Sequence, residues 1–226
     1  MLNQLLWHLP PILSIIGYIN YPKDFRINQI LLNTVSIIHN SALILFSGTT
    51  FILLSKILYQ KGIVYQSNYY FQDQFFDTII YYFYLSKYYE FMDTFILYLN
   101  GKKPIFLQKF HHAGAVICWH LGYVYKVDCI WLATFANSFI HTIMYSYYLG
   151  CLLKINQVRF IKQYLTSLQL IQLFIPNFIS LYCYCPPIET KFNYIIIKIF
   201  VSYVFCLVIL FGQFYYNNYI VKNKIK

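Results

Sequence analysis

The sequence predicts an all-α integral membrane protein with about seven transmembrane helices. The composition is 59% hydrophobic and only 11% charged, and the mean hydropathy is +0.52. Long stretches such as residues 27–54 contain no charged residue. A soluble domain of this size would need a much larger polar surface. We therefore expect one transmembrane domain that spans residues 1–226 and folds as a single helical bundle.

Apolar stretches divide the chain into its expected helices when a window of roughly 20 residues is applied. The fourth stretch is short, and the second is long enough to tilt or to extend past the bilayer. No internal repeat or long linker separates them. The stretches are residues 4–20, 29–55, 74–99, 111–126, 130–153, 163–185 and 194–220.

The basic residues between these stretches predict an orientation, because short loops rich in lysine and arginine stay in the cytosol. Their uneven distribution places the N terminus outside and the C terminus in the cytosol. One set of loops holds eleven basic residues (Lys23, Arg26, Lys102, Lys103, Lys109, Lys154, Arg159, Lys162, Lys222, Lys224 and Lys226), and the other set holds four (Lys56, Lys61, Lys126 and Lys191).

The last five residues, KNKIK, place lysines third and fifth from the end. This is the pattern of a cytosolic signal for retrieval to the endoplasmic reticulum. A basic tail also follows simply from the positive-inside rule. We expect a multi-pass protein of the endoplasmic reticulum membrane.

The charge and cysteine content exclude two classes of protein. The net charge of +10 comes from short clusters between apolar stretches, so we do not expect nucleic-acid binding. The cysteines lie in or beside apolar stretches without zinc-type spacing, which predicts neither a metal site nor a disulfide framework. They are Cys118, Cys129, Cys151, Cys183, Cys185 and Cys206.

Ionisable side chains also occur inside the apolar stretches, where each costs several kcal/mol unless it is paired or faces a polar cavity. In KYYEFMDT, Lys87, Glu90 and Asp93 follow one another at three-residue steps and lie near one helical face. Lys87 can pair with Glu90 at this spacing. The motif predicts either a structural ion pair at a helix end or part of a site.

Three further polar clusters follow along the chain. QKFHH contains Gln108, His111 and His112, which form either part of a site or a packed, hydrogen-bonded doublet. NSFIHTIMYSYY places Asn137 and His141 on one polar stripe. Met144, Tyr145 and Tyr148 continue that stripe and are expected to be wall residues, while TSLQLIQ sets Thr166, Gln169 and Gln172 at three-residue steps.

The amides of the last cluster could simply hold helices together. Four polar stripes on consecutive helices, however, most simply converge on one internal chamber. Imidazoles in such a chamber can act as acid, base or nucleophile.

Taken together, these motifs resemble the fatty-acid elongase (ELO) family of very-long-chain 3-ketoacyl-CoA synthases. The similarity extends roughly from residue 21 to residue 220 and follows the family's order and approximate spacing. It is carried by Lys87/Glu90/Asp93/Thr94, His111-His112, Asn137 to His141 with Met144-Tyr145 and Tyr147-Tyr148, Thr166/Gln169/Gln172, and His39-Asn40 with Leu43 and Ser47.

The resemblance implies seven helices, six of them around a tunnel for the acyl chain, with a cytosolic mouth for coenzyme A. The implied reaction is the decarboxylative condensation of malonyl-CoA with a long-chain fatty acyl-CoA, which gives a 3-ketoacyl-CoA, carbon dioxide and coenzyme A. It implies no bound cofactor or metal. The expected partners are membrane lipid, the reductases and dehydratase of the elongation cycle, and a second copy of the chain.

The resemblance also suggests roles for the site residues. His111 is the leading acyl-accepting nucleophile, although the sequence does not decide between His111 and His112, and His112 and His141 orient the thioester or move protons. Gln108 and Asn137 can donate hydrogen bonds to developing oxyanions, each supplying roughly 2–4 kcal/mol. Lys87, Glu90, Asp93, Thr94, Met144, Tyr145, Tyr148, Gln169 and Gln172 organise the chamber or contact substrate. The basic loops, especially Lys102, Lys103, Lys109, Lys154, Arg159 and Lys162, offer charge for the phosphates of coenzyme A.

Gln108 departs from the family pattern, in which the histidine box usually begins with histidine. Glutamine occurs at this position in members that act on polyunsaturated chains, so we expect a polyunsaturated substrate. The same departure leaves open a catalytically silent, elongase-like scaffold or lipid-binding subunit. A membrane di-iron desaturase is a third alternative, but it needs about eight histidines and this chain has six.

Overall fold

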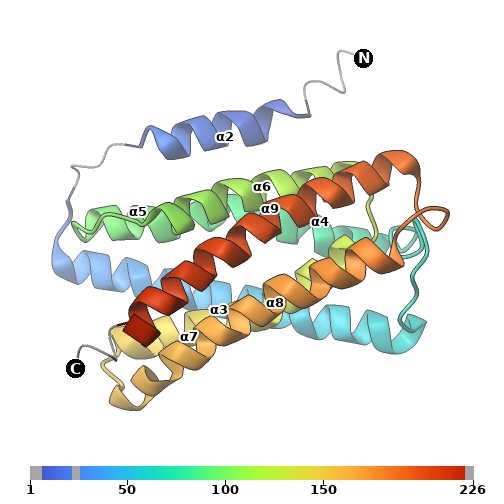
Figure 1. The fold of residues 1–226 in the computed structure, drawn as a ribbon. Coiled ribbons are helices and arrows are strands. Elements are labelled where there is room, and N and C mark those ends of the chain that lie inside the picture. Colours follow the sequence, from blue (N-terminus) through green and yellow to red (C-terminus); the bar gives the residue numbers. More distant parts are fainter. Residues whose placement is uncertain (1–6, 22–25, 222–226) are drawn as a thin grey trace.

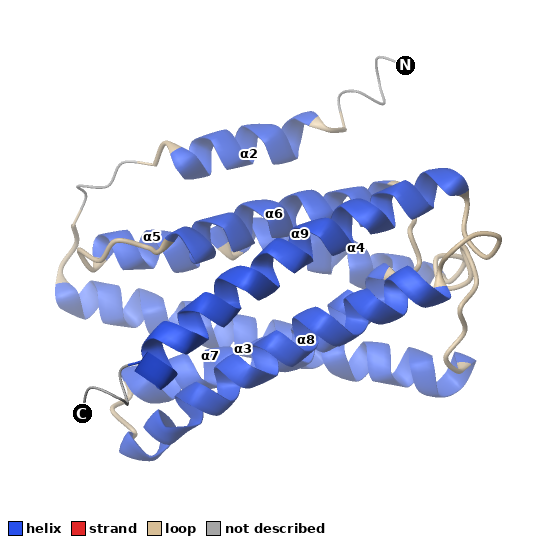
Figure 2. Cartoon of the chain, in the orientation of Figure 1, coloured by secondary structure: helices blue, strands red, loops and turns tan. Residues whose placement is uncertain are grey.

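The computed structural model describes residues 7–21 and 26–221, and this part of the chain forms helices and loops without strands (Figures 1 and 2). The predicted all-α membrane fold is confirmed. Residues 4–6 of the first predicted stretch, Lys23 and the KNKIK tail lie outside the described residues, as does the side chain of Arg159. The helices are α2 (Leu9–Ile19), α3 (Gln29–Lys61), α4 (Gln74–Tyr89), α5 (Phe91–Leu99), α6 (Phe106–Val124), α7 (Ile130–Leu152), α8 (Ile161–Cys183) and α9 (Lys191–Tyr215), with a 3-10 turn at Asn156–Phe160 and a π-helical turn at Tyr216–Val221.

The helix boundaries differ from the predicted stretches at several places. Helix α3 continues to Lys61, where Gly62 adopts a φ of 76° and ends it. Helix α6 begins at Phe106, five residues before the predicted start at residue 111, so the paired histidines lie in its second turn. The stretch 74–99 is divided at Glu90 into α4 and α5, because the Asp93 N–H bonds the Glu90 carbonyl three residues back at 3.1 Å.

Membrane-spanning character is strongest in α3, α8 and α9. Among the described residues, these three helices, with α9 extended to Val221, are both long and apolar enough to cross a bilayer. Helices α6 and α7 have 19 and 23 residues and carry buried histidines among their apolar residues. Large apolar side chains such as Leu45, Phe178 and Phe205 are exposed on the outside of the bundle, where lipid can contact them.

The helices pack in pairs around the interior. Helix α3 runs along α7, α8 packs against both α7 and α9, and α6 packs against α4 and α9. Helix α2 lies on the outside of the bundle, next to α6 (Figure 1). This arrangement brings the polar faces of α5, α6, α7 and α8 toward one interior, as their sequence stripes predict.

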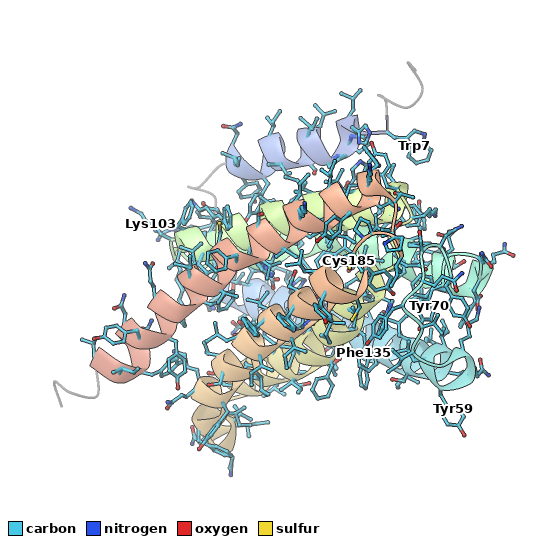
Figure 3. All side chains as sticks on the ribbon, turned by 45° about the vertical axis from the view of Figure 1, so that its right-hand side comes forward. Trp7, Tyr59, Tyr70, Lys103, Phe135 and Cys185 are labelled. Carbon is cyan, nitrogen blue, oxygen red and sulfur yellow. The ribbon has the colours of Figure 1, made fainter. Side chains whose placement is uncertain are left out.

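One end of the bundle, which we call the closed end, consists of the loops at residues 62–73, 125–129 and 184–190. The main apolar core lies beneath it and includes the buried Leu54, Tyr70, Trp131, Tyr184 and Ile197. In Figure 3, Tyr59 and Tyr70 lie toward this end, and Lys103 lies at the opposite end. The packed core therefore seals one end of the bundle.

Asp128 connects two loops of the closed end. Its side chain is completely buried, and its carboxylate accepts hydrogen bonds from the backbone N–H groups of Tyr69, Tyr70 (3.1 Å) and Phe71 (3.3 Å). Burial raises the pKa of Asp128 to about 6, although the three N–H donors favour the charged form. The carboxylate is therefore mostly ionised at pH 7.5. It fixes the loop between α3 and α4 against the loop between α6 and α7.

We expect Asp128→Ala to lower the free energy of unfolding by about 3 kcal/mol or more, because it leaves buried N–H groups without an acceptor. Asp73→Ala is the matched control, since Asp73 also caps backbone N–H groups, at the start of α4, but is partly exposed. The control is expected to lose only about 1 kcal/mol. Unfolding of the purified protein in detergent at pH 7.5 measures both, and equal losses would contradict the anchoring role of Asp128.

Candidate functional site

A cavity of about 560 Å³ occupies the interior of the bundle toward the end opposite the closed end. We call it the main cavity. Helices α3, α5, α6, α7, α8 and α9 all contribute to its wall. Near the end of the bundle its wall includes Asn100, Lys102 and Lys162. The cavity is large enough for a substantial part of an organic ligand.

The structure brings most of the predicted site residues to this cavity. Lys87, Glu90, Thr94 and Asn137 are not part of its wall and lie behind it or beside it. Those that line the main cavity are Asp93, Gln108, His111, His112, His141, Met144, Tyr145, Tyr148, Gln169 and Gln172.

Lys87 and Glu90 form a buried ion pair at the junction of α4 and α5. Their exposed fractions are 1% and 2%, and Lys87 Nζ donates to Glu90 Oε1 at 2.7 Å. Lys87 Nζ also donates to Asn137 Oδ1 at 2.8 Å and lies 4.1 Å from the centre of the Phe83 ring. Glu90 Oε1 lies 3.5 Å from His141 Nδ1. The pair therefore ties the α4–α5 junction to the asparagine and histidine of α7.

Asp93 lies on α5 in the wall of the main cavity and faces side chains of three other helices. Its Oδ1 accepts a hydrogen bond from His39 Nε2 of α3 at 2.9 Å, and its Oδ2 accepts one from the Tyr145 hydroxyl of α7 at 2.7 Å. His112 Nε2 of α6 lies 3.8 Å from the same Oδ2. One carboxylate thus faces two histidines and a tyrosine.

Gln108 is held by a chain of hydrogen bonds that reaches the outer helix α2. Its Nε2 donates to Thr94 Oγ1 at 3.3 Å, and Thr94 Oγ1 lies 2.8 Å from the Tyr18 hydroxyl. An amide nitrogen carries two hydrogens, so one remains for a ligand. The predicted oxyanion-donating role of Gln108 can use only that second hydrogen while this contact persists.

His111 lies where the main cavity meets a second cavity of about 70 Å³ that extends toward the closed end. The two cavities share His111, Gln172 and Leu173. The Tyr203 hydroxyl of α9 donates to the His111 carbonyl oxygen at 2.7 Å. Gly114 allows this contact, because a methyl group at Gly114 would overlap the Tyr203 ring. The wall of the second cavity is mostly apolar, with Ala115, Phe200 and Leu207 among its residues, and also includes Asn137.

Several buried polar atoms around the main cavity have no hydrogen-bond partner. Buried polar atoms are normally paired, so unpaired ones beside a cavity can take a partner from water or from a polar ligand in that cavity. Among the described residues, the unpaired atoms near the main cavity are His39 Nδ1, His112 Nδ1, His141 Nδ1, Glu90 Oε2 and Gln172 Oε1. One further unpaired atom, Glu189 Oε2, lies at the closed end. Within the same described ranges, no group of three or more histidine, cysteine, aspartate or glutamate side chains is arranged to hold a metal ion.

Only some of the basic residues predicted to contact phosphate line the main cavity. Lys102 and Lys162 belong to the wall of the main cavity. Lys103 and Lys154 are exposed but do not line it, and Lys109 Nζ lies 5.9 Å from the centre of the Tyr98 ring. An anionic group at the outer part of the cavity would therefore meet Lys102 and Lys162 first.

Comparison with known proteins identifies the family of this chain. The model of the GNS1/SUR4 (ELO) family matches residues 12–226. The chain belongs to the GNS1/SUR4 family.

Relatives of this GNS1/SUR4 chain include several fatty acid elongases. It is 38% identical over 143 residues to fatty acid elongase sre1 of Dictyostelium discoideum, a match that covers 62% of this chain and 53% of the relative. It is 34% identical over 147 residues to very long chain fatty acid elongase 4 of Trypanosoma cruzi, with coverages of 60% and 50%. Very long chain fatty acid elongase 5 of Tachysurus fulvidraco is 32% identical over 213 residues, with coverages of 88% and 70%. The chain thus spans about half the length of the first two relatives.

His39 is a cavity residue of this GNS1/SUR4 protein that the sequence-based site prediction left out. It lines the main cavity and has an exposed fraction of only 3%. The available signal was a histidine inside the charge-free stretch 27–54, next to Asn40. An imidazole at membrane depth needs a polar partner, and here that partner is Asp93, 54 positions away in sequence.

Breaking the Lys87–Glu90 pair should destabilise the fold. We expect Lys87→Met to lower the free energy of unfolding by about 3–5 kcal/mol, because the Glu90 carboxylate would remain buried without its cation. The matched control is the double variant Lys87→Met/Glu90→Gln, in which no charge is left unpaired and most of the loss should be recovered. Chemical unfolding in detergent measures both, and a double variant no more stable than the single one would contradict this explanation.

Proposed function

We propose that this chain is the condensing enzyme of fatty-acid elongation. It joins a long-chain fatty acyl-CoA to malonyl-CoA with loss of carbon dioxide, and it releases a 3-ketoacyl-CoA and coenzyme A. The observation that carries the proposal is the position of His111 between two cavities of different character, a larger one that carries polar side chains and has lysines at its outer part, and a small, mostly apolar one. When an acyl thioester is bound at His111, its coenzyme A portion can lie in the main cavity and its acyl chain can point toward the second cavity.

The chemistry requires a nucleophile, donors for developing negative charge, and exclusion of water. His111 attacks the thioester carbonyl in our proposal, with His112 and His141 orienting the thioester or moving protons. Asn137 supplies an oxyanion donor, since its Oδ1 accepts from Lys87 and its amide hydrogens face elsewhere. The apolar wall of the second cavity keeps water away from the acyl chain.

The substrates follow from the same arrangement. Lys102 and Lys162 attract the phosphates of coenzyme A, and no tightly bound cofactor or metal is required. Gln108 supports polyunsaturated chains among the substrates. The distribution of lysine and arginine supports a cytosolic C terminus, and the location that we propose is the endoplasmic reticulum membrane. The reductases and dehydratase of the cycle, and a second copy of this chain, are the partners we propose.

We expect membranes that contain this protein to convert labelled malonyl-CoA and a long-chain acyl-CoA into a 3-ketoacyl-CoA two carbons longer than the acyl substrate. His111→Ala should lower the rate by about 100-fold or more, because the acyl acceptor is lost. A panel of saturated and polyunsaturated acyl-CoAs measures the substrate class in the same assay.

His120→Ala is the control, because His120 is a histidine of the same helix, α6, and lies outside the walls of both cavities. It should keep most of the activity. Mass spectrometry after incubation with acyl-CoA alone should find the acyl group on His111, and an adduct on His112 would reverse that assignment. No product across the panel from folded protein would favour a silent scaffold.

A further inference from the structure

His39 forms an aspartate-histidine pair that the proposed roles of His111, His112 and His141 leave unused. Its Nε2 lies 2.9 Å from Asp93 Oδ1. An ionised carboxylate only accepts hydrogen bonds, so Nε2 carries the hydrogen of this contact. Nδ1 of the same ring is buried and has no hydrogen-bond partner. Asp93 therefore orients the ring and leaves Nδ1 as its one uncommitted atom.

A carboxylate and two aromatic rings surround the imidazole of His39. Asp93 also accepts a hydrogen bond from the Tyr145 hydroxyl at 2.7 Å, so two donors meet its carboxylate. The rings of Tyr89 and Tyr145 lie with their centres 5.2 and 6.0 Å from that of His39. His112 approaches the same carboxylate from α6 at 3.8 Å. A carboxylate so placed stabilises an imidazolium that forms or persists beside it.

The overall condensation consumes one proton. Malonyl-CoA enters with a carboxylate that leaves as neutral carbon dioxide, and coenzyme A leaves as a neutral thiol. When a neutral imidazole attacks the acyl-CoA, a C–N bond forms, the C–S bond breaks, and the products are an acylimidazolium and a coenzyme A thiolate. The enolate formed by decarboxylation then attacks the acylimidazolium and regenerates neutral imidazole. The thiolate is the species that needs the proton, and an alkyl thiolate departs poorly without one.

We propose that His39 is the acid that gives its Nδ1 proton to the sulfur of the departing coenzyme A. Asp93 is its positioning residue. His39 begins each cycle doubly protonated, becomes neutral when the thiol forms, and regains its proton from solvent through the main cavity, whose wall it shares with His111 and His112. This assignment rests on the proposed condensing function and adds a residue on α3 to proposed catalytic residues that otherwise lie on α6 and α7.

The role of His39 is tested by comparing two substrates that differ only in the thiolate that leaves. We compare a long-chain acyl-CoA with the para-nitrophenyl thioester of the same acyl chain, using malonyl-CoA as acceptor, so that both give the same product. The aryl thiolate is a much weaker base and departs without protonation. His39→Gln should therefore lose about 100-fold or more in kcat with acyl-CoA and less than about tenfold with the aryl thioester. Asp93→Asn, which keeps His39 in place, should show the same dependence on leaving group.

Two controls separate catalysis from structure. His120→Gln removes an equally buried histidine outside both cavities and should leave both rates within a few-fold of wild type. His39→Gly should regain activity toward acyl-CoA when imidazole buffer is added, a measurement that does not depend on the aryl substrate. If His39 had only a structural role, its substitution would lower kcat equally with both substrates, and added imidazole would not restore activity.

Each outcome decides the proposal. Equal losses with the two thioesters in both variants, together with no rescue by imidazole, would overturn the role of His39 while leaving the condensing function intact. No product from wild-type protein with either thioester would overturn the condensing function, and this inference with it. Selective loss with acyl-CoA, or rescue of the glycine variant, supports His39 as the acid.

Discussion

The buried ion pair between Lys87 and Glu90 is the constraint on which the site depends. Charges at this depth among apolar helices need a partner, and each of these two has the other at 2.7 Å. Their contacts with Asn137 and His141 of α7 determine how the α4–α5 junction lies against that helix. The interruption at Glu90 in turn places Asp93 in the first turn of α5 and toward the main cavity. An electrostatic requirement thus positions the carboxylate that meets three neighbouring helices.

The two ends of the bundle differ in structure: the closed end is packed, and the opposite end contains the main cavity. At the closed end, aromatic packing and the Asp128 anchor join loops that are far apart in sequence. At the opposite end, the main cavity reaches Lys102 and Lys162, and its wall carries unpaired polar atoms. Buried polar atoms without partners reduce stability, and a rigid core elsewhere offsets that cost. Stability is concentrated at one end and binding capacity at the other.

Much of the fold and the site could be predicted from the chain alone, and the physical reason is the membrane environment. Apolar length predicted the helical segments, and polar residues inside them predicted the chamber. Ten of the fourteen proposed site residues line the main cavity. The ion pair between Lys87 and Glu90 follows from helical spacing, because residues three apart on a helix are neighbours. The remaining four residues lie behind or beside the wall of the main cavity, and spacing along one helix does not distinguish such residues from those that line it.

The sequence by itself determined the class of protein, the helical segments and the set of polar residues, because periodicity and the cost of burying charge act locally along the chain. Tertiary structure alone decided that His39 and Asp93 meet, that Thr94 holds Gln108, and that His111 separates two cavities. These contacts join residues on different helices, and each depends on how far one helix is shifted and rotated against another. That relation is set by the packing of many side chains together, and no single motif contains it.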